Sequence, residues 1–432
     1  MEVPVLILLI SFIACLALSV PIAISIGIST VVTMLLTIPA GPAVTTVAQR
    51  MATGIDSFAL LAIPFFILAG QLMARGGIAG RLIDFARVLV GGFPGGLAYI
   101  NIVACMFFGA ISGSAVAATS AIGGFMIPAM EREGYERPFS VSVTMTGSIT
   151  GLLIPPSNVL IVYSLASGGV SIAALFIAGY LPGILVGLGL MAVCGVIASI
   201  RAYPAGERPA LTEALAIFLK AIPSLMLIVI VMGGIVAGLF TATEASAVAV
   251  IYALILTLVY REIRIRELSD ILLKTVETTA IVMLLIGTST AMSWILSYEN
   301  IPQELTAALL SFTDSRILIL LFINIVLLLV GTFMDMTPAV LIFTPIFLPI
   351  AVMLGMTPLH FGIMMVLNLC IGLCTPPVGS ILFVGCGLGR TSIAETTRAL
   401  LPFYAVMVLA LLLVTYLPWI SETLPRMFGY SF

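Results

Sequence analysis

The sequence predicts an all-α membrane protein that crosses the bilayer many times and consists of two similar halves. Hydrophobic residues make up 61% of its 432 residues and charged residues only 8%, whereas soluble proteins are roughly a quarter charged. Mean hydropathy is +1.28. In addition, two apolar stretches of bilayer-spanning length are each interrupted by a proline pair, and the interruptions fall at corresponding places in the two halves of the chain. We therefore expect a single membrane domain made of two repeats.

The first interruption is Pro155-Pro156, within the apolar stretch 139–168. A proline pair removes two backbone N–H donors and its rings clash with the preceding turn, so a straight helix cannot continue. Backbone that lacks partners at membrane depth is tolerated only where it is buried in protein or lines a cavity. Small and hydroxyl-bearing residues surround the break, from Gly147 to Asn158, and let a ligand approach the main chain. This stretch is the first candidate binding site.

The second interruption is Pro376-Pro377. Around it the repeat continues, because Gly372 precedes this pair at the same spacing as Gly151 precedes the first pair. Interrupted spans at corresponding places in two halves are the best sequence indication of a transporter's binding site near the membrane midplane. The alternative is that prolines fell by chance in two of many helices.

The first half, 1–200, is expected to begin with scaffold spans over 4–74. Its apolar stretch 4–39 would form a helix of roughly 54 Å, which exceeds a hydrocarbon core of ~30 Å, so we predict two short spans separated at Pro21. The later elements expected in this half are a loop (40–57), a span (58–74), an amphipathic interfacial helix (75–94), a hairpin (95–130), a charged loop (131–138), the broken helix (139–168) and a span (172–200).

The second half, 221–432, follows a polar cytoplasmic linker at 201–220 and repeats this order, with scaffold spans over 221–297. Its expected elements are spans at 221–239 and 243–260, a charged arm (261–277), a span (278–297), a polar loop (298–315), a hairpin (316–354), the broken helix (359–388) and a final span (400–420).

The two hairpins are predicted because 95–130 and 316–354 are each too long for one straight span. The first has a turn-forming centre from Gly109 to Ser114, and the second is centred on Gly331 to Pro338. Each is expected to be re-entrant, with two half-helices that meet near the midplane and return to the same side.

The distribution of basic residues indicates that the halves have inverted topology. If the first hairpin enters from the cytoplasm and the second from the opposite side, the cytoplasmic segments contain 14 of the 17 Lys and Arg residues, as the positive-inside rule requires. These basic segments are 75–94, 131–138, 201–220, 261–277 and 389–399. The net charge of −2 and the lack of a basic run exclude nucleic acid as an expected partner.

Four ordered motifs together resemble the large membrane subunit of a tripartite ATP-independent periplasmic (TRAP) transporter, over nearly the whole chain. One departure is Ala242, where the family usually has proline in a Thr-Pro-Thr-Glu-Ala string, and it affects a helix start rather than the proposed site. The motifs run from Gly109 to Ala121, from Met145-Thr146-Gly147 to Ile154-Pro155-Pro156-Ser157-Asn158, from Gly238 to Ala245 and from Gly331 to Pro338.

This resemblance implies a secondary active transporter with an elevator mechanism, of a fold like that of the ion transporter superfamily, in the bacterial inner membrane. It implies Na⁺-coupled uptake of a small organic acid, of the sialic acid or C4-dicarboxylate class, that a periplasmic substrate-binding protein delivers. A small four-span membrane subunit is the second expected partner, and no cofactor is expected besides the coupling ion.

Sodium prefers oxygen ligands, and the unwound carbonyl groups of a broken helix supply them. Pairing each hairpin with the break in its own half suggests two Na⁺ sites, with packing turns as the alternative. The first site would use Gly109, Gly151, Ile154 and Ser157, and the second Gly331, Gly372, Thr375 and Val378.

The expected substrate ligands are mainly hydroxyl and amide side chains near the hairpins and breaks, which are otherwise explained by interhelical hydrogen bonds. Asp335 is the one acid placed deep in a hairpin, where a carboxylate is costly and is functional by default. It would bind Na⁺, contact the substrate or cap the following half-helix. The candidate substrate ligands are Ser112, Ser114, Ser157, Asn158, Thr332 and Asp335.

Three further residues have simpler interpretations. Glu244 lies three residues after Thr241, which is the spacing of a helix capping box. His360 is expected at the membrane interface rather than in a proton relay, and Tyr163 is a candidate for lining a substrate path.

Other function classes remain open. A stand-alone ion-coupled anion carrier of related fold, without a binding protein, is the alternative within transport. A membrane-embedded enzyme is less favoured because the sequence offers no convergent acid–base pair. Proton coupling is less favoured because more buried titratable residues are expected of it.

Overall fold

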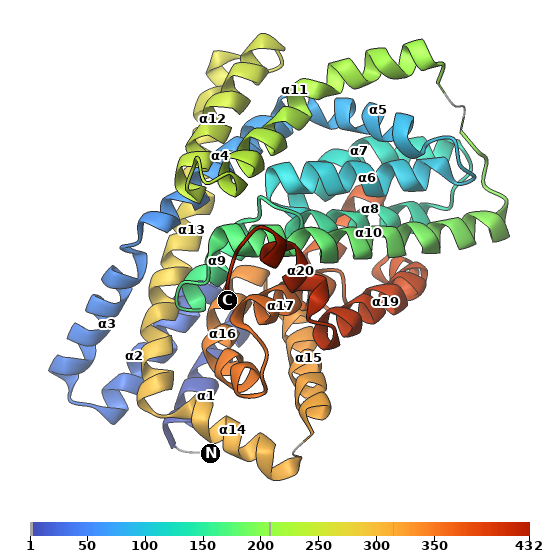
Figure 1. The fold of residues 1–432 in the computed structure, drawn as a ribbon. Helices are drawn as coiled ribbons and strands as arrows, with labels where there is room; N and C mark the ends of the chain where they lie inside the picture. Colours follow the sequence, from blue (N-terminus) through green and yellow to red (C-terminus); the bar gives the residue numbers. More distant parts are fainter. Residues whose placement is uncertain (1–2, 207–208, 314) are drawn as a thin grey trace.

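The computed structural model describes residues 3–206, 209–313 and 315–432. These residues form helices and loops, and the one β-bridge found among them joins Pro94 to Ala205 (Figure 1). The helices up to the middle of the chain are α1 (Val3–Ala17), α2 (Ile22–Thr37), α3 (Ala40–Ile55), the 3₁₀ turn η1 (Phe58–Leu61), α4 (Ala62–Arg75), α5 (Ile78–Val90), α6 (Gly96–Ser112), α7 (Ala115–Arg132), α8 (Arg137–Leu153), α9 (Asn158–Ala166) and α10 (Ile172–Arg201).

In the described part of the second half there are ten more helices. Within the described ranges, eight helices of the chain are long and apolar enough to cross a membrane, or nine if α8 and α9 count as one bent span. The second-half helices are α11 (Leu211–Val236), α12 (Ala242–Val259), α13 (Ile265–Tyr298), α14 (Ile301–Phe312), α15 (Arg316–Phe333), α16 (Met336–Met353), α17 (Pro358–Leu373), α18 (Ser380–Gly389), α19 (Ile393–Tyr416) and α20 (Trp419–Met427).

Both predicted breaks are confirmed. Helix α8 ends at Leu153, and α9 starts at Asn158 after a bend of 49°. In the second half α17 ends at Leu373 and α18 starts at Ser380. The cause is local in both cases, because each proline pair removes the N–H groups that would continue the helix.

Both hairpins are present, and their turns lie within the stretches that the sequence predicted. Gly113 and Ser114 join α6 to α7, and Met334 and Asp335 join α15 to α16. Of the stretch from Gly109 to Ser114, only its last two residues form the turn, and Gly109 lies inside α6. It serves instead to bring two helices together, as described below.

Two segments predicted as loops are helical. Residues 40–55 form α3, because its prolines lie at or next to the helix start, where a missing N–H costs nothing, and because Ala43 and Val47 are buried on the face that packs on α13. The predicted polar loop at 298–315 contains α14, although residue 314 lies outside the described residues.

Three boundaries also differ from the sequence prediction. The charged arm 261–277, from Ile265 onward, and the following span form one helix, α13, of 34 residues. The predicted linker 201–220 is shorter than expected, because α11 already starts at Leu211. Residues 207 and 208 of this linker lie outside the described residues. The final span ends at Tyr416 and is followed by a separate short helix, α20.

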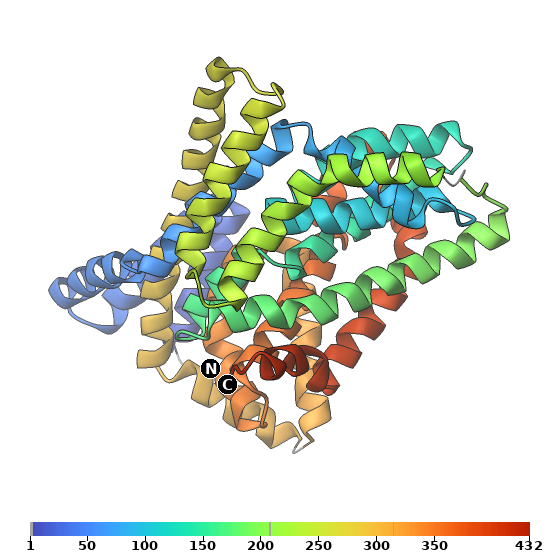
Figure 2. The ribbon, with the colours of Figure 1, turned by 45° about the horizontal axis from the view of Figure 1, so that its top comes forward.

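The helices form two packed groups, which we call the frame and the bundle. The frame consists of α1–α4 and α11–α13, and the bundle of α6–α10 and α15–α20. In Figures 1 and 2 much of the frame lies along the left side and much of the bundle to the right. Helix α5 follows α4 and packs on α6, whereas α14 follows α13 and packs on α16. Each group contains helices from both halves of the sequence.

The two broken helices pack together at the centre of the bundle. Every residue of α8 from Phe139 to Leu153 is buried. Tyr163 of α9 is fully buried as well, packs over Gly362 and donates a hydrogen bond of 2.6 Å to the carbonyl oxygen of Pro358. The prediction that Tyr163 lines a substrate path is therefore wrong, because its ring and hydroxyl join the two halves instead.

We expect Tyr163→Phe to lower the stability of the protein by about 0.5–1.5 kcal/mol, since it removes a buried hydrogen bond between the two halves. Thermal denaturation in detergent measures the effect. Tyr416→Phe is the matched control, because the Tyr416 hydroxyl donates a similar bond of 2.9 Å to Ile317 at an exposed site, where water replaces the lost partner. Equal losses from both substitutions would contradict a special role for the buried bond.

The structure also describes the surroundings of Glu244 and His360. The capping box at the start of α12 is confirmed, since Glu244 accepts from the Thr241 N–H at 2.8 Å and donates its own N–H to the Thr241 hydroxyl. The interfacial position of His360 stays a prediction, because burial among helices does not fix its depth in the membrane. Its side chain is fully buried and its Nε2 lies 2.6 Å from the Val414 carbonyl oxygen, because α19 and α20 pack on α17.

The five basic segments lie at one end of the molecule, linked in a chain of contacts. The α4–α5 turn meets the α12–α13 turn, the α5–α6 loop meets the linker after α10, and the starts of α8 and α19 are hydrogen-bonded. The pairs that make these contacts are Arg81 and Glu262, Gly95 and Pro204, Arg201 and Glu136, and Ser142 and Thr396. We call this end of the molecule the basic end.

Candidate functional site

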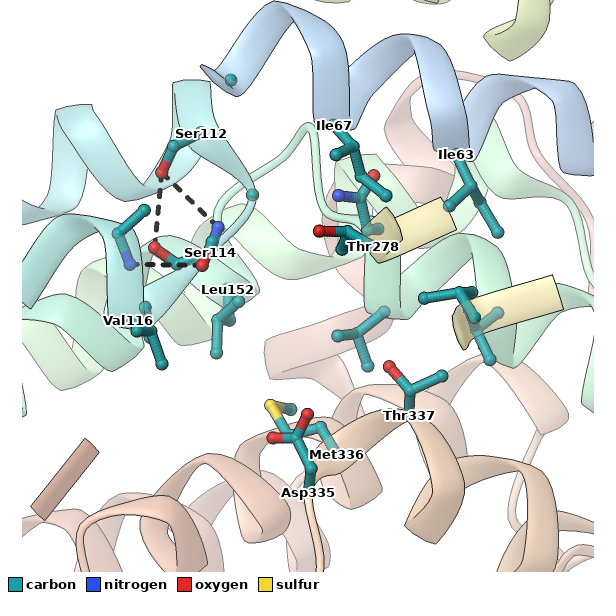
Figure 3. Close-up of a pocket in the computed structure, with 18 of the residues that line it drawn as sticks. Ile63, Ile67, Ser112, Ser114, Val116, Leu152, Thr278, Asp335, Met336 and Thr337 are labelled. Carbon is teal, nitrogen blue, oxygen red and sulfur yellow. Dashed lines mark hydrogen bonds between the residues drawn. The ribbon is translucent and has the colours of Figure 1, made fainter. Parts of the chain in front are cut away.

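A cavity of about 290 Å³ lies where the bundle meets the frame (Figure 3). The bundle contributes both hairpin turns and both helix breaks, which come from distant parts of the sequence. The frame contributes α4 and α13. The bundle residues that line it are 112–117, Leu152, Asn158, Val159, Val162, Asp335, Met336, Thr337, Leu373 and Ser380, and the frame residues are Ile63, Ile67, Gly70, Gln71, Ala74, Thr278 and Val282.

The first hairpin turn is held in place by its own hydroxyl groups. The Ser114 hydroxyl caps α7 by accepting a hydrogen bond of 3.2 Å from the Ala117 N–H. The Ser112 hydroxyl accepts from the Ser114 N–H at 3.4 Å. Gly113 between them has φ +61°, and a Cβ there would lie 3.1 Å from Nδ2 of Asn158. The glycine thus lets the turn lie against the start of α9.

Asp335 occupies in the second hairpin the place that Ser114 occupies in the first, since each directly precedes the second helix of its hairpin. It lies at the N-cap position of α16, but its side chain makes no capping hydrogen bond. Figure 3 shows its carboxylate in the cavity, opposite Thr278 and the first hairpin, and the residue is exposed there. Because the carboxylate is not used for capping, it is available to a ligand.

Three side-chain oxygens at the breaks lack hydrogen-bond partners among the described residues. They are Oγ of Ser157, Oδ1 of Asn158 and Oγ of Ser380, and all three atoms are buried. Buried polar atoms normally have partners, so unpartnered ones indicate a ligand or ordered water. Asn158 and Ser380 line the cavity, whereas Ser157 does not.

Each hairpin crosses the broken helix of its own half at a pair of glycines. A Cβ added to Gly151 would lie 2.3 Å from Cα of Gly109, and one added to Gly372 would lie 2.6 Å from Cα of Gly331. The backbones therefore touch in both places. The residues expected to bind the two Na⁺ ions are brought to these crossings or to the breaks that follow them.

The first break exposes carbonyl groups as the sequence predicts. The carbonyls of Gly151 and Leu152 would be bonded by the N–H groups four residues later, which are those of Pro155 and Pro156 and do not exist. The Ile154 N–H still donates a helical hydrogen bond to the Thr150 carbonyl oxygen. Oxygen atoms are thus available beside the first glycine crossing.

At the second break some oxygens already have partners. The Gly372 carbonyl accepts from the Thr375 N–H at 2.9 Å, and the Thr375 hydroxyl donates to the Ile371 carbonyl at 2.7 Å. Val378 is 41% exposed. The oxygen atoms expected to form the second Na⁺ site are therefore less available to an ion than those of the first.

Thr332 lies outside the cavity. Its hydroxyl donates to the Leu329 carbonyl at 2.7 Å, and its own carbonyl accepts from the Gly379 N–H at 3.0 Å. The residue therefore connects the second hairpin to the second break.

Four polar residues at the cavity were not among the predicted ligands: Gln71, Thr278, Thr337 and Ser380. Ser380 was accessible to sequence reasoning, because it lies shortly after the second proline pair, as Asn158 lies shortly after the first. Gln71 and Thr278 belong to frame helices far from either break, and no sequence signal indicated them.

Electrostatically, the cavity is lined by the positive ends of helices rather than by basic side chains. No Arg, Lys or His is among the described residues that line it, and Asp335 is their one charged group. The first turns of α7, α9, α16 and α18 all contribute lining residues. Helix N-termini present free N–H groups and a partial positive charge, which favours anions.

The model of a protein family, "Tripartite ATP-independent periplasmic transporter, DctM component", matches residues 9–420. The chain belongs to this family. It is thus a large permease component of a TRAP transporter and a multi-pass membrane protein, which confirms the resemblance seen in the motifs.

Individual relatives agree with this assignment. The chain is 52% identical to the uncharacterized protein YgiK of Salmonella typhimurium, over 99% of this chain and 98% of the relative. It is 42% identical to the C4-dicarboxylate TRAP transporter large permease protein DctM of Pseudomonas aeruginosa, over 94% and 95%. Among solved structures, the YdaH transporter of Alcanivorax borkumensis has a similar fold, with a TM-score of 0.62 over 88% of each chain at 13% identity.

Proposed function

We propose that this TRAP permease subunit performs Na⁺-coupled uptake of a small organic acid across the bacterial inner membrane. A periplasmic binding protein delivers the acid, and a small four-span membrane subunit completes the transporter. The family name describes a tripartite transporter of the periplasm, which favours these partners over a stand-alone carrier. It also favours transport over the membrane-embedded enzyme.

The observation that carries this proposal is the convergence of four helix N-termini on one cavity without a basic side chain. Together with the unpartnered oxygens of Asn158 and Ser380, they suit a ligand that carries both a carboxylate and hydrogen-bond donors. Ser112 and Ser114 add hydroxyl groups from the first hairpin. We propose these four residues and Asp335 as the substrate ligands.

Sodium ions would balance the remaining negative charge. The Asp335 carboxylate and an anionic substrate repel each other in a cavity of low dielectric constant, so their joint presence requires cations nearby. The glycine crossings provide suitable places, because hard cations prefer oxygen ligands. The first ion would be held at Gly109, Gly151, Ile154 and Ser157, and the second at Gly331, Gly372, Thr375 and Val378.

An elevator movement is supported by the division into frame and bundle. The glycine crossings lie within the bundle, so the hairpins and broken helices would move as one body. Contact with the frame includes one close approach, in which a Cβ on Gly70 of α4 would lie 2.7 Å from the Ser112 carbonyl oxygen. The corresponding hairpins, breaks and glycine pairs of the two halves support inverted repeats.

A cavity of about 290 Å³ is at the small end of the range for ligand pockets, roughly 300–1,000 Å³. This size favours an acid of few atoms. A C4-dicarboxylate fits it more readily than a sialic acid, and both classes belong in the test.

The test is uptake into proteoliposomes that contain the whole transporter, with binding proteins loaded with candidate organic acids. An inward Na⁺ gradient is expected to drive accumulation, and a K⁺ gradient of equal size serves as the control. Uptake driven by a proton gradient alone, or uptake at the same rate without the binding protein, would contradict the proposal.

A further inference from the structure

The frame side of the cavity is apolar except for two residues. On α4 the lining residues Ile63, Ile67, Gly70 and Ala74 surround Gln71, and on α13 Val282 follows Thr278. Gln71 is half-buried and Thr278 is exposed to the cavity. Figure 3 shows Thr278 across the cavity from Asp335 and Thr337. Two polar side chains thus face the substrate ligands from helices outside the bundle.

The Thr278 hydroxyl can accept a hydrogen bond from a ligand. It donates its proton to the Lys274 carbonyl oxygen at 2.9 Å, so its lone pairs remain available toward the cavity. The Gln71 amide offers both a donor and an acceptor. A hydroxylated organic acid held by the bundle therefore finds complementary groups on the frame.

Both residues lie toward the basic end of the molecule. Gln71 is one turn before Arg75, at the end of α4, and Thr278 is one turn after Lys274, in the first half of α13. The end of α4 and the start of α13 are adjacent, because α4 packs on α13 and a Cβ on Gly77, in the α4–α5 turn, would lie 2.7 Å from Oε1 of Glu262 in the α12–α13 turn. By the positive-inside rule this end is cytoplasmic.

We infer that Gln71 and Thr278 are substrate-positioning residues of the inward-facing state. They contact the substrate only while the bundle lies beside this end of the frame, and this contact is broken when the bundle moves away. They therefore set the affinity for substrate on the cytoplasmic side and leave loading on the periplasmic side unchanged. This inference rests on the proposed transport function and adds two ligands from outside the moving bundle.

The experiment compares Thr278→Val and Gln71→Leu with the wild type in proteoliposomes of the whole transporter. Externally added binding protein selects the correctly oriented molecules. Two concentrations are measured: that of loaded binding protein outside for half-maximal uptake, and that of substrate inside for half-maximal exchange. Each variant is expected to raise the internal value ~5-fold, the effect of about one hydrogen bond, and to leave the external value unchanged.

Thr275→Val is the matched control, because Thr275 lies on the same helix outside the cavity and its hydroxyl bonds the Ile271 carbonyl at 2.8 Å. A merely structural effect would move both values together. An unchanged internal value, or equal changes inside and outside, would overturn the inference while wild-type uptake still supports transport. Absence of uptake by the wild type would instead refute the proposed function on which the inference rests.

Discussion

Replacing Asp335 by Asn is expected to lower the rate of Na⁺-driven uptake by ~10- to 100-fold. The carboxylate makes no capping hydrogen bond and lies in the cavity, so its charge is available to a cation or to substrate donors. Hydrogen bonds to charged groups contribute about 1.5–3 kcal/mol, which corresponds to that range of rates. Uptake into proteoliposomes at several Na⁺ concentrations measures the effect.

Asp270→Asn is the control for this substitution, because Asp270 is an exposed acid on α13 outside the cavity. It removes the same charge and is expected to leave uptake unchanged. The melting temperature of Asp335→Asn should fall only slightly, since the wild-type side chain makes no capping hydrogen bond and only the favourable interaction of its charge with the helix N-terminus, about 0.3–1 kcal/mol, is lost. Wild-type uptake by Asp335→Asn would remove the residue from the mechanism.

Gly151→Ala is expected to destabilise the bundle by about 3 kcal/mol or more and to abolish uptake. The new Cβ would lie 2.3 Å from Cα and 2.6 Å from the carbonyl carbon of Gly109. Both are backbone atoms, so relief requires α6 and α8 to move apart, and overpacking of this kind usually costs about 1–3 kcal/mol, occasionally more. Thermal denaturation of the purified protein measures the loss of stability.

Two further alanine variants make the test specific. Gly124→Ala changes a helical glycine on α7 with no atom within 4 Å of the added Cβ, and alanine there is expected to maintain or slightly raise stability. Gly372→Ala meets the Gly331 backbone at 2.5 Å and should resemble Gly151→Ala. A melting temperature for Gly151→Ala equal to that of Gly124→Ala would disprove the close crossing.

The positions of the breaks were predictable because their cause is local. Proline lacks an N–H wherever it occurs, so Pro155-Pro156 and Pro376-Pro377 end a helix regardless of what surrounds them. The capping box of Thr241 and Glu244 was predictable for the same reason, since both partners lie within one turn.

Local patterns did not suffice where a residue acts through a distant neighbour. Gly109, at the start of the predicted turn stretch, lies within α6 and allows contact with Gly151. His360 gave no sequence sign of burial within the protein, but α19 and α20 cover it. The segment 40–57 suggested a loop, but most of it forms α3. The partner that stabilises α3 is α13, which belongs to the other half of the chain, so the segment alone does not reveal the helix.

The sequence by itself determined that this chain is a membrane protein with two hairpins and two broken helices. Hydropathy and proline chemistry act on each segment alone, which is why the pattern suffices. Only the tertiary structure decided that the turns and breaks of both halves meet at one cavity, that Thr332 lies outside it, and that Gln71 and Thr278 complete it. Those arrangements depend on packing between helices that are far apart in the chain, and no local pattern records such contacts.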